Sequence, residues 1–174
     1  MAENTEPSNL EAGDHQSYME FALSLATISP PKPTNYRVGA VVVDTATNEI
    51  LATGYTLELP GNTHAEQCCF EKLAKKYSVP SDRLGEVLPD SVILYTTVEP
   101  CSQRLSGNLP CVDRILAIGN KIKTVFAGVY EPEKFVSANS SKRKLEAAGI
   151  EFVHVAGLEK EILDVATAGH EKSI

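Results

Sequence analysis

Long apolar runs are missing from this chain of 174 residues. A helix that crosses a membrane needs about 18 consecutive apolar residues, so the sequence predicts no membrane partner. Internal repeats and low-complexity tracts are missing as well, which argues against a fibrous or disordered chain. A hydrophobic content of 43% with 22% charged residues is ordinary for a globular protein, and the length predicts one domain with a real core.

Positive charge is in deficit. The chain has 16 Lys and Arg against 23 Asp and Glu, a net charge of -7. General affinity for nucleic acid requires a dense basic face, so we expect no nucleic-acid partner, whereas a small anionic substrate could still be met by one or two local cations. The first residues, MAENTEP, are acidic and lack the charged-then-apolar pattern of a secretory signal, so we expect a cytoplasmic protein.

Cysteine is scarce, with four residues that could in principle form two disulfides. Cys68 and Cys69 are neighbours, however, and the chain shows no secretory signal. In a reducing compartment, metal ligation and burial explain cysteines better than disulfides do.

Hydrophobic periodicity divides the chain into helices that alternate with strands. Strands are expected over residues 38–43, 50–55, 92–97, 124–129 and 150–155. Helices are expected between Asp14, a capping residue, and the prolines after Ser29, over residues 64–77, between Pro110 and Gly119, and over 140–148 and 158–166. The first two strands should form an antiparallel hairpin, and the last three, which helices connect, should be parallel.

This order predicts an α/β protein, a three-layer α/β/α sandwich with a five-stranded mixed sheet. Residues 78–90 contain two prolines and a glycine and are expected to form a surface excursion. The expected domain organisation is a flexible N-terminal segment over residues 1–13, a single domain over 14–167 and a flexible tail over 168–174.

Two stretches carry residues suited to bind a metal. His64-Ala65-Glu66 opens one expected helix, while Cys101 follows a strand and Cys111 opens another helix. One imidazole and two thiolates are zinc ligands, and three protein ligands leave a position for water. Zinc lowers the pKa of such a water to about 7, and a nearby free carboxylate, Glu66, can move its protons.

Other residues carry alternative interpretations. Cys68 lies one turn after His64 and could compete as a ligand, although a cysteine on an apolar helix face is more often part of the core. Glu99, next to Pro100, is expected to have a structural role rather than to act as a second base. The remaining histidines, His15, His154 and His170, lack partners at ligand spacing.

These motifs resemble the cytidine-deaminase superfamily over about residues 15 to 155. The matching stretches are NYRVGAVVV at residues 35–43, HAE at 64–66, TVEPCS at 97–102 and Pro110-Cys111. Most members of the superfamily have two residues between the cysteines, whereas this chain has nine, at 102–110. A long polar insertion at this place is similar to that of the pyrimidine deaminases of riboflavin biosynthesis. Tyr36, in place of the usual proline, departs from the pattern.

The resemblance implies a cytidine-deaminase-like fold, with zinc held by His64, Cys101 and Cys111 and with Glu66 as the catalytic acid and base. It implies that Asn35 binds substrate. Arg104, in the insertion, is our candidate for a phosphate contact because a guanidinium forms paired hydrogen bonds to phosphate. The superfamily commonly forms dimers, which implies a homodimer.

We recognise no reductase domain in the sequence. This resembles the fungal arrangement, in which the deaminase and the reductase are separate enzymes. The substrate implied is the phosphorylated pyrimidine 2,5-diamino-6-ribitylamino-4(3H)-pyrimidinone 5'-phosphate. Two alternatives stay open. One is a nucleotide, free-base or tRNA adenosine deaminase with the same zinc chemistry. The other is a zinc-stabilised interaction protein without turnover, against which the free carboxylate of Glu66 argues.

Overall fold

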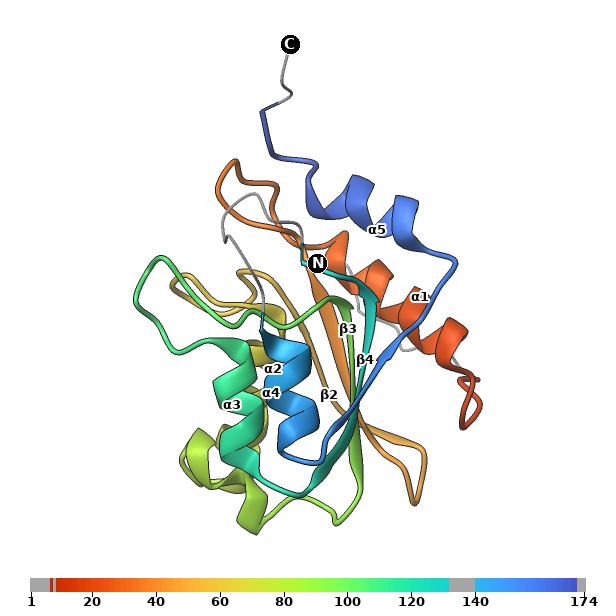
Figure 1. Cartoon of the computed structure of the whole chain (residues 1–174), viewed down its shortest axis with the longest axis vertical. Coiled ribbons are helices and arrows are strands. Elements are labelled where there is room, and N and C mark those ends of the chain that lie inside the picture. The colour runs from red at the N-terminus through yellow and green to blue at the C-terminus, as the bar shows by residue number, and fades with distance from the viewer. Residues whose placement is uncertain (1–6, 8, 132–139, 172–174) are drawn as a thin grey trace.

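The computed structural model describes residue 7 and residues 9–131 and 140–171, and consists of a central sheet between two layers of helices (Figure 1). The strands are β1 (Gly39–Asp44), β2 (Glu49–Tyr55), β3 (Val92–Val98), β4 (Ile122–Val129) and β5 (Glu151–His154). The helices are α1 (His15–Ala26), α2 (Ala65–Tyr77), α3 (Cys111–Ile118), α4 (Ser141–Ala147) and α5 (Glu159–Ala166), with a 3-10 helix, η1 (Ser81–Glu86), after α2. The expected three-layer α/β/α sandwich is confirmed.

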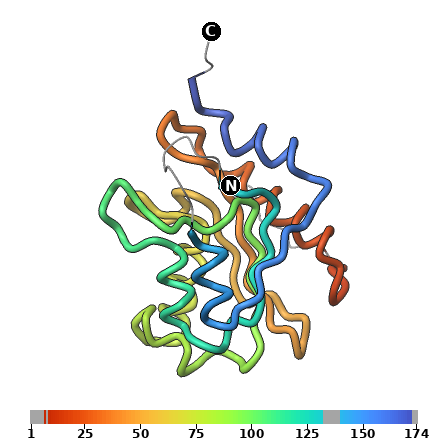
Figure 2. Tube along the Cα trace, viewed as in Figure 1, coloured from red at the N-terminus to blue at the C-terminus, as the bar shows by residue number. Residues whose placement is uncertain are grey.

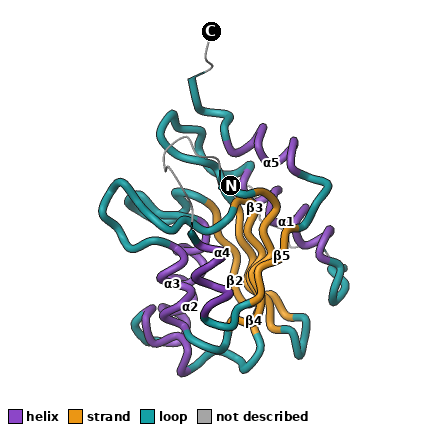
Figure 3. The backbone as a smooth tube through the Cα atoms, viewed as in Figure 1, coloured by secondary structure: helices purple, strands orange, loops and turns teal. Residues whose placement is uncertain are grey.

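The sheet, whose strands are orange in Figure 3, has the strand order β2-β1-β3-β4-β5. Strand β1 is antiparallel to both of its neighbours, while β3, β4 and β5 are parallel, as the alternation of strands and helices predicts. All six residues of β1 are buried, which explains why its apolar residues are consecutive rather than alternating.

Each face of the sheet has its own core. On one face α2, α3 and α4 contribute apolar side chains such as Leu73, Ile115 and Leu145. On the other face α1 and α5 contribute side chains such as Leu25 and Ile162. Since both faces are covered by helices, the two long edges and the two ends of the sheet are the places left for a site.

The start of α1 follows the sequence prediction. Asp14 is its N-cap and accepts hydrogen bonds from the backbone nitrogen of Ser17 at 3.1 Å and from the Ser17 hydroxyl at 2.7 Å. These bonds satisfy a donor that the first helical turn would otherwise leave free.

The expectation for residues 78–90 was wrong in one respect. This segment contains η1, and two of its leucines are buried, Leu84 at 0% and Leu88 at 4% exposure. Gly85 lies against the backbone of Ile118, where a Cβ atom would come within 2.2 Å of the carbonyl oxygen. A single short turn has no hydrophobic period that the sequence could display, so its inward face was missed.

The two ends of the chain fall partly outside the described residues, namely 1–6, 8 and 172–174, and their flexibility stays a prediction. The described part of the tail contacts the segment before β1. The imidazole Nε2 of His170 is 2.8 Å from the carbonyl oxygen of Asn35, and its ring lies 5.0 Å from that of Tyr36. None of the described helices combines the length and the apolar character that a membrane span requires.

Candidate metal centre and active site

Three potential metal ligands meet at the carboxyl end of β3. His64 is the N-cap of α2, Cys101 follows β3, and Cys111 is the first residue of α3. The Nδ1 atom of His64 is 3.5 Å from each of the two sulfur atoms, and the three ligand atoms all lie within 4.8 Å of one another. Within the described ranges this is the one group of His, Cys, Asp and Glu residues with ligand spacing.

The spacing of these atoms fits zinc. Zn–N bonds of about 2.0 Å and Zn–S bonds of about 2.3 Å at a tetrahedral angle place the nitrogen about 3.5 Å from each sulfur. Both observed Nδ1–Sγ distances are 3.5 Å. The donor set of one imidazole and two buried thiols is also the set that zinc prefers.

The surroundings of the two thiols favour binding of a cation. The hydrogen bond between Cys101 and Cys111 lowers the pKa of Cys101, with help from His64, and raises the pKa of Cys111. The backbone nitrogen of Cys111 also donates to the sulfur of Cys101, at 3.2 Å. A lowered pKa favours the thiolate form of Cys101 beside the imidazole, and the thiolate is the form that binds a metal ion.

Glu66 is the buried carboxyl group of the site, with 3% exposure. It is the second residue of α2, and its Oε1 accepts a hydrogen bond of 2.8 Å from the hydroxyl of Thr96 on β3. Burial raises the pKa of Glu66, an effect that His64 and Thr96 oppose. A carboxyl group held in this way, beside the ligand cluster but outside it, can take up a proton and return it.

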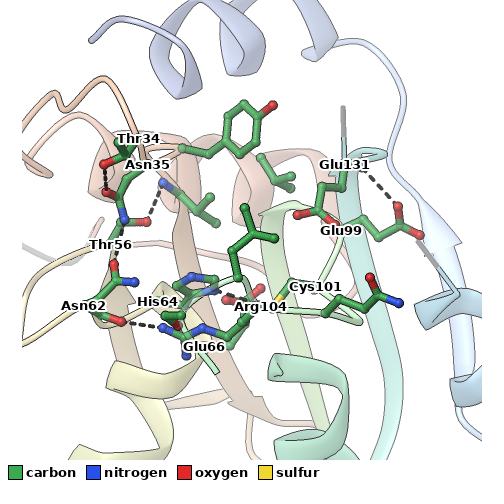
Figure 4. A pocket seen from close by; sticks show the side chains of 16 residues that line it. Thr34, Asn35, Thr56, Asn62, His64, Glu66, Glu99, Cys101, Arg104 and Glu131 are labelled. Atoms are coloured by element: carbon green, nitrogen blue, oxygen red, sulfur yellow. Dashed lines mark hydrogen bonds between the residues drawn. The ribbon is translucent and has the colours of Figure 1, made fainter. Parts of the chain in front are cut away.

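A cavity of about 490 Å³ opens over the cluster (Figure 4). This volume is in the range of small-molecule sites, about 300–1,000 Å³. His64, Glu66 and Cys101 lie on one side of it. The rest of the wall comes from the segment before β1, the turn before α2, the end of β3, the insertion at 102–110 and Glu131 after β4. A pyrimidine-sized ring can therefore reach the carboxyl group of Glu66.

Asn35 and Arg104, the two predicted substrate residues, both line this cavity. The side-chain nitrogen of Asn35 donates to Oδ1 of Asn62 at 2.8 Å. The guanidinium of Arg104 donates to the carbonyl oxygen of Asn62, to Oε1 of Gln67 at 3.0 Å and to the carbonyl oxygen of Leu109 at 3.4 Å. Arg104 is thus tied to the protein through its two terminal nitrogens, and its contact with phosphate stays a prediction.

The alternative ligand Cys68 lies apart from the cluster. It is fully buried, and burial raises the pKa of its thiol, while a hydrogen bond with Thr63 opposes the rise. The His154 ring is bonded to the carbonyl oxygen of Gly128, and that of His15 is stacked on Phe126. These residues are not part of the group with ligand spacing in the described ranges.

Comparison with known proteins places this geometry in a family. The model of the cytidine and deoxycytidylate deaminase zinc-binding region matches residues 12–129. The chain belongs to the cytidine and deoxycytidylate deaminase family. The match includes the three potential ligands and Glu66, and the matching model is that of a zinc-binding region, in agreement with the fit of the donor atoms.

Relatives within this deaminase family are close in sequence and structure. A diaminohydroxyphosphoribosylamino-pyrimidine deaminase of Schizosaccharomyces pombe is 38% identical over 157 residues, which are 90% of this chain and 36% of that protein. The chain therefore spans about a third of that relative. The crystal structure of Aspergillus oryzae Rib2 deaminase, a C-terminal deletion mutant, is 50% identical with a TM-score of 0.83, over 90% of this chain and 92% of the other.

Two further structures extend the comparison. The same Aspergillus oryzae deaminase in complex with DARIPP is 49% identical, with a TM-score of 0.81 over 90% of this chain and 92% of that one. A deaminase/reductase from Thermotoga maritima is 30% identical with a TM-score of 0.68, over 89% of this chain and 40% of that one. The cytidine-deaminase-like fold expected from the sequence is confirmed.

Sequence reasoning missed the polar residues that support the candidate site. Thr96 contacts Glu66 and Gln67 contacts Arg104, but the sequence pattern assigned a role to neither Thr96 nor Gln67. The one available signal was the position of Gln67, three residues after the helix cap, where a glutamine forms a capping box.

Glu99 has the kind of environment that a structural role requires. It is 6% exposed, and its two carboxylate oxygens accept hydrogen bonds from the backbone of Glu131 at 3.0 Å and from the hydroxyl of Ser141 at 2.9 Å. Ser102 accepts a bond of 3.0 Å from the backbone of Ser140. The residues on both sides of Cys101 therefore hold the end of β4 and the start of α4.

Proposed function

We propose that this chain is a zinc-dependent hydrolase that deaminates 2,5-diamino-6-ribitylamino-4(3H)-pyrimidinone 5'-phosphate, a step of riboflavin biosynthesis. One observation carries the proposal. A buried carboxyl group, Glu66, lies beside a cluster of three potential zinc ligands, and a cavity of about 490 Å³ opens over them. The names of the relatives, among them a Rib2 deaminase that is 50% identical over 90% of this chain, supply the substrate class.

His64, Cys101 and Cys111 are the proposed zinc ligands. Zinc held by them supplies a Lewis acid that lowers the pKa of a water molecule to about 7. The N-termini of α2 and α3 both face the cluster, and their positive dipole ends favour the thiolate forms of the ligands.

Glu66 is the proposed catalytic acid and base. Its carboxylate removes a proton from water as the water oxygen bonds to the ring carbon that bears the 2-amino group, and it passes this proton to the neighbouring ring nitrogen. It then takes the second water proton and gives it to the departing amine, so that the C–N bond breaks and ammonia leaves. Thr96 keeps the carboxyl group in one position through its hydrogen bond of 2.8 Å.

Asn35 and Arg104 are the proposed substrate contacts away from the reacting carbon. The Nδ2 atom of Asn35 has two hydrogens, and one of them is used by Asn62. Arg104 has five N–H donors, of which three are used by protein oxygens, and its Nε has no partner among the described residues. The Nε atom is buried, so the second hydrogen of Asn35 Nδ2 and the terminal N–H of Arg104 that is left are our candidates for the polar groups and the phosphate of the substrate.

Mass spectrometry tests the reaction. Incubation with the ribitylamino substrate should raise its mass by one unit and release one ammonia per molecule. Equal or faster turnover of cytosine, deoxycytidylate or tRNA would assign the chain to another deaminase of the family. Zinc binding without turnover of any of these would indicate an interaction protein.

We also expect a cytoplasmic homodimer. The four cysteines are free thiols, which suits a reducing compartment. The resemblance to the superfamily supports the dimer, and light scattering at several protein concentrations would measure the mass of the particle.

A further inference from the structure

The insertion between the two cysteine ligands is fastened to the helix that carries the third ligand. Its residues, 102–110, run from Cys101 to Cys111 (Figure 2). The side chain of Arg104 reaches from the insertion toward Asn62 in the turn before α2 (Figure 4). The guanidinium bonds to the carbonyl oxygen of Asn62 and, at 3.0 Å, to Oε1 of Gln67. Both acceptors are within three residues of His64.

Gln67 is placed so that one oxygen atom joins two segments. It is the third residue of α2 and is 9% exposed. Its Oε1 accepts from the backbone nitrogen of His64 at 3.4 Å as well as from Arg104, while its Nε2 donates to Glu71 at 2.8 Å. The bond to Glu71 fixes the orientation of the amide, because a carboxylate can only accept. The oxygen is therefore directed at His64 and Arg104.

We propose that Gln67 and Arg104 form a clamp that slows the release of zinc. For the metal to leave, the segment with the two cysteines must separate from His64, and this movement breaks the bonds between Arg104 and residues 62–67. Hydrogen bonds from a charged guanidinium are stronger than neutral ones, and contacts around the ligands commonly alter metal affinity. Gln67 is a positioning residue, since it is neither a proposed ligand nor part of the cavity wall.

Metal release in the presence of excess chelating dye tests the clamp without any substrate. Gln67→Met keeps the length and the helix preference of the side chain but removes the amide oxygen. Arg104→Lys keeps the charge but loses the planar fork that reaches three acceptors at once. Each change should accelerate the release of zinc by about 10-fold. The double variant should release zinc no faster than the faster single variant, because each change breaks the same contact.

Arg114→Met is the matched control. Arg114 is also a cation that touches the insertion, since its Nε donates to the carbonyl oxygen of Leu109 at 3.3 Å, but it extends from α3 and not toward α2. Its replacement should leave the release rate at that of the parent protein. If Arg114→Met accelerated the release of zinc as much as Gln67→Met does, a general loosening of the insertion would explain the faster release, and the clamp would be refuted.

The proposal is overturned if both single variants release zinc at the parent rate, or if their effects multiply in the double variant. Circular dichroism and zinc content, both measured before the dye is added, show whether each variant is folded and loaded with zinc. Arg104→Lys serves as the second test if Gln67→Met is unstable. The inference rests on the ligand set proposed above. Full zinc content in Cys101→Ala would refute the ligands themselves, whereas unchanged release rates in a protein with the expected ligands would refute only the clamp.

Discussion

Replacement of Glu66 by glutamine separates proton transfer from every other property of the site. Glutamine has nearly the volume of glutamate, and its side-chain oxygen can still accept the hydrogen bond of 2.8 Å from Thr96. Glu66 is not one of the three potential metal ligands, so its replacement should leave the zinc content at the parent level. The amide cannot take up and return a proton, and general acid-base catalysis contributes about 10²–10⁴-fold, so turnover should fall by at least about 100-fold. That loss corresponds to about 2.7 kcal/mol of transition-state stabilisation.

The fold should not lose stability in Glu66→Gln. Burial raises the pKa of this carboxyl group, which means that the folded protein favours the protonated, uncharged form. Below the pKa of the unfolded chain, Glu66 is uncharged in both states and its burial does not lower the free energy of unfolding. As the pH rises from there toward the raised pKa of the folded protein, the unfolded chain gains the charge more readily, and the free energy of unfolding falls. Glutamine never carries that charge, so after removal of zinc from both proteins the free energy of unfolding of the variant near neutral pH should be equal to or larger than that of the parent.

The assay compares turnover by mass spectrometry, zinc content and thermal unfolding in the same preparation. Glu20→Gln is the control, since it changes an exposed carboxyl group of α1 that is outside the cavity wall. Turnover of Glu66→Gln within a few-fold of the parent would refute the assignment of Glu66 as acid and base. Loss of zinc in this variant would show that the carboxylate is itself a ligand.

Three further outcomes follow from the structure. Cys101→Ala should lose zinc and unfold at a lower temperature, as metal analysis and calorimetry can measure, because metal binding is coupled to folding; full zinc occupancy would contradict this. Arg104→Ala, assayed with zinc in excess, should raise KM for the phosphorylated substrate by an amount equivalent to about 1.5–3 kcal/mol. KM for the dephosphorylated compound should stay nearly unchanged, and equal effects on both compounds would refute the phosphate contact. Asp14→Ala should lower Tm by about 2–4 °C through loss of the helix cap. Since hydrogen bonds with Ser17 lower the pKa of Asp14, its contribution is complete above the pKa of the unfolded chain and disappears as the pH falls through the lower folded value, so the variant and the parent should converge in acid.

The features that could be predicted from the sequence are those with a local or periodic signature. The consecutive apolar residues of β1, the cap at Asp14 and the positions of the ligands relative to helix starts each depend on neighbours within a few residues. The features that were missed depend on contacts between distant segments. The burial of Leu84 needs α3 beside it, and the bond between Gln67 and Arg104 joins residues 37 positions apart. No local pattern of residues indicates that two such distant segments are in contact.

The anchoring of the insertion at its two ends has a consequence for how such enzymes can diversify. Cys101 is held by the end of β3 and Cys111 by the start of α3, so the positions of both sulfur atoms are set by the sheet and helix rather than by the length of the loop between them. Doubling a loop changes its closure entropy by only about 0.6 kcal/mol. Loops of other lengths can therefore connect the two cysteines while the sulfur atoms keep their positions, so the part of the cavity wall that the insertion supplies can change without a change in the three potential ligands.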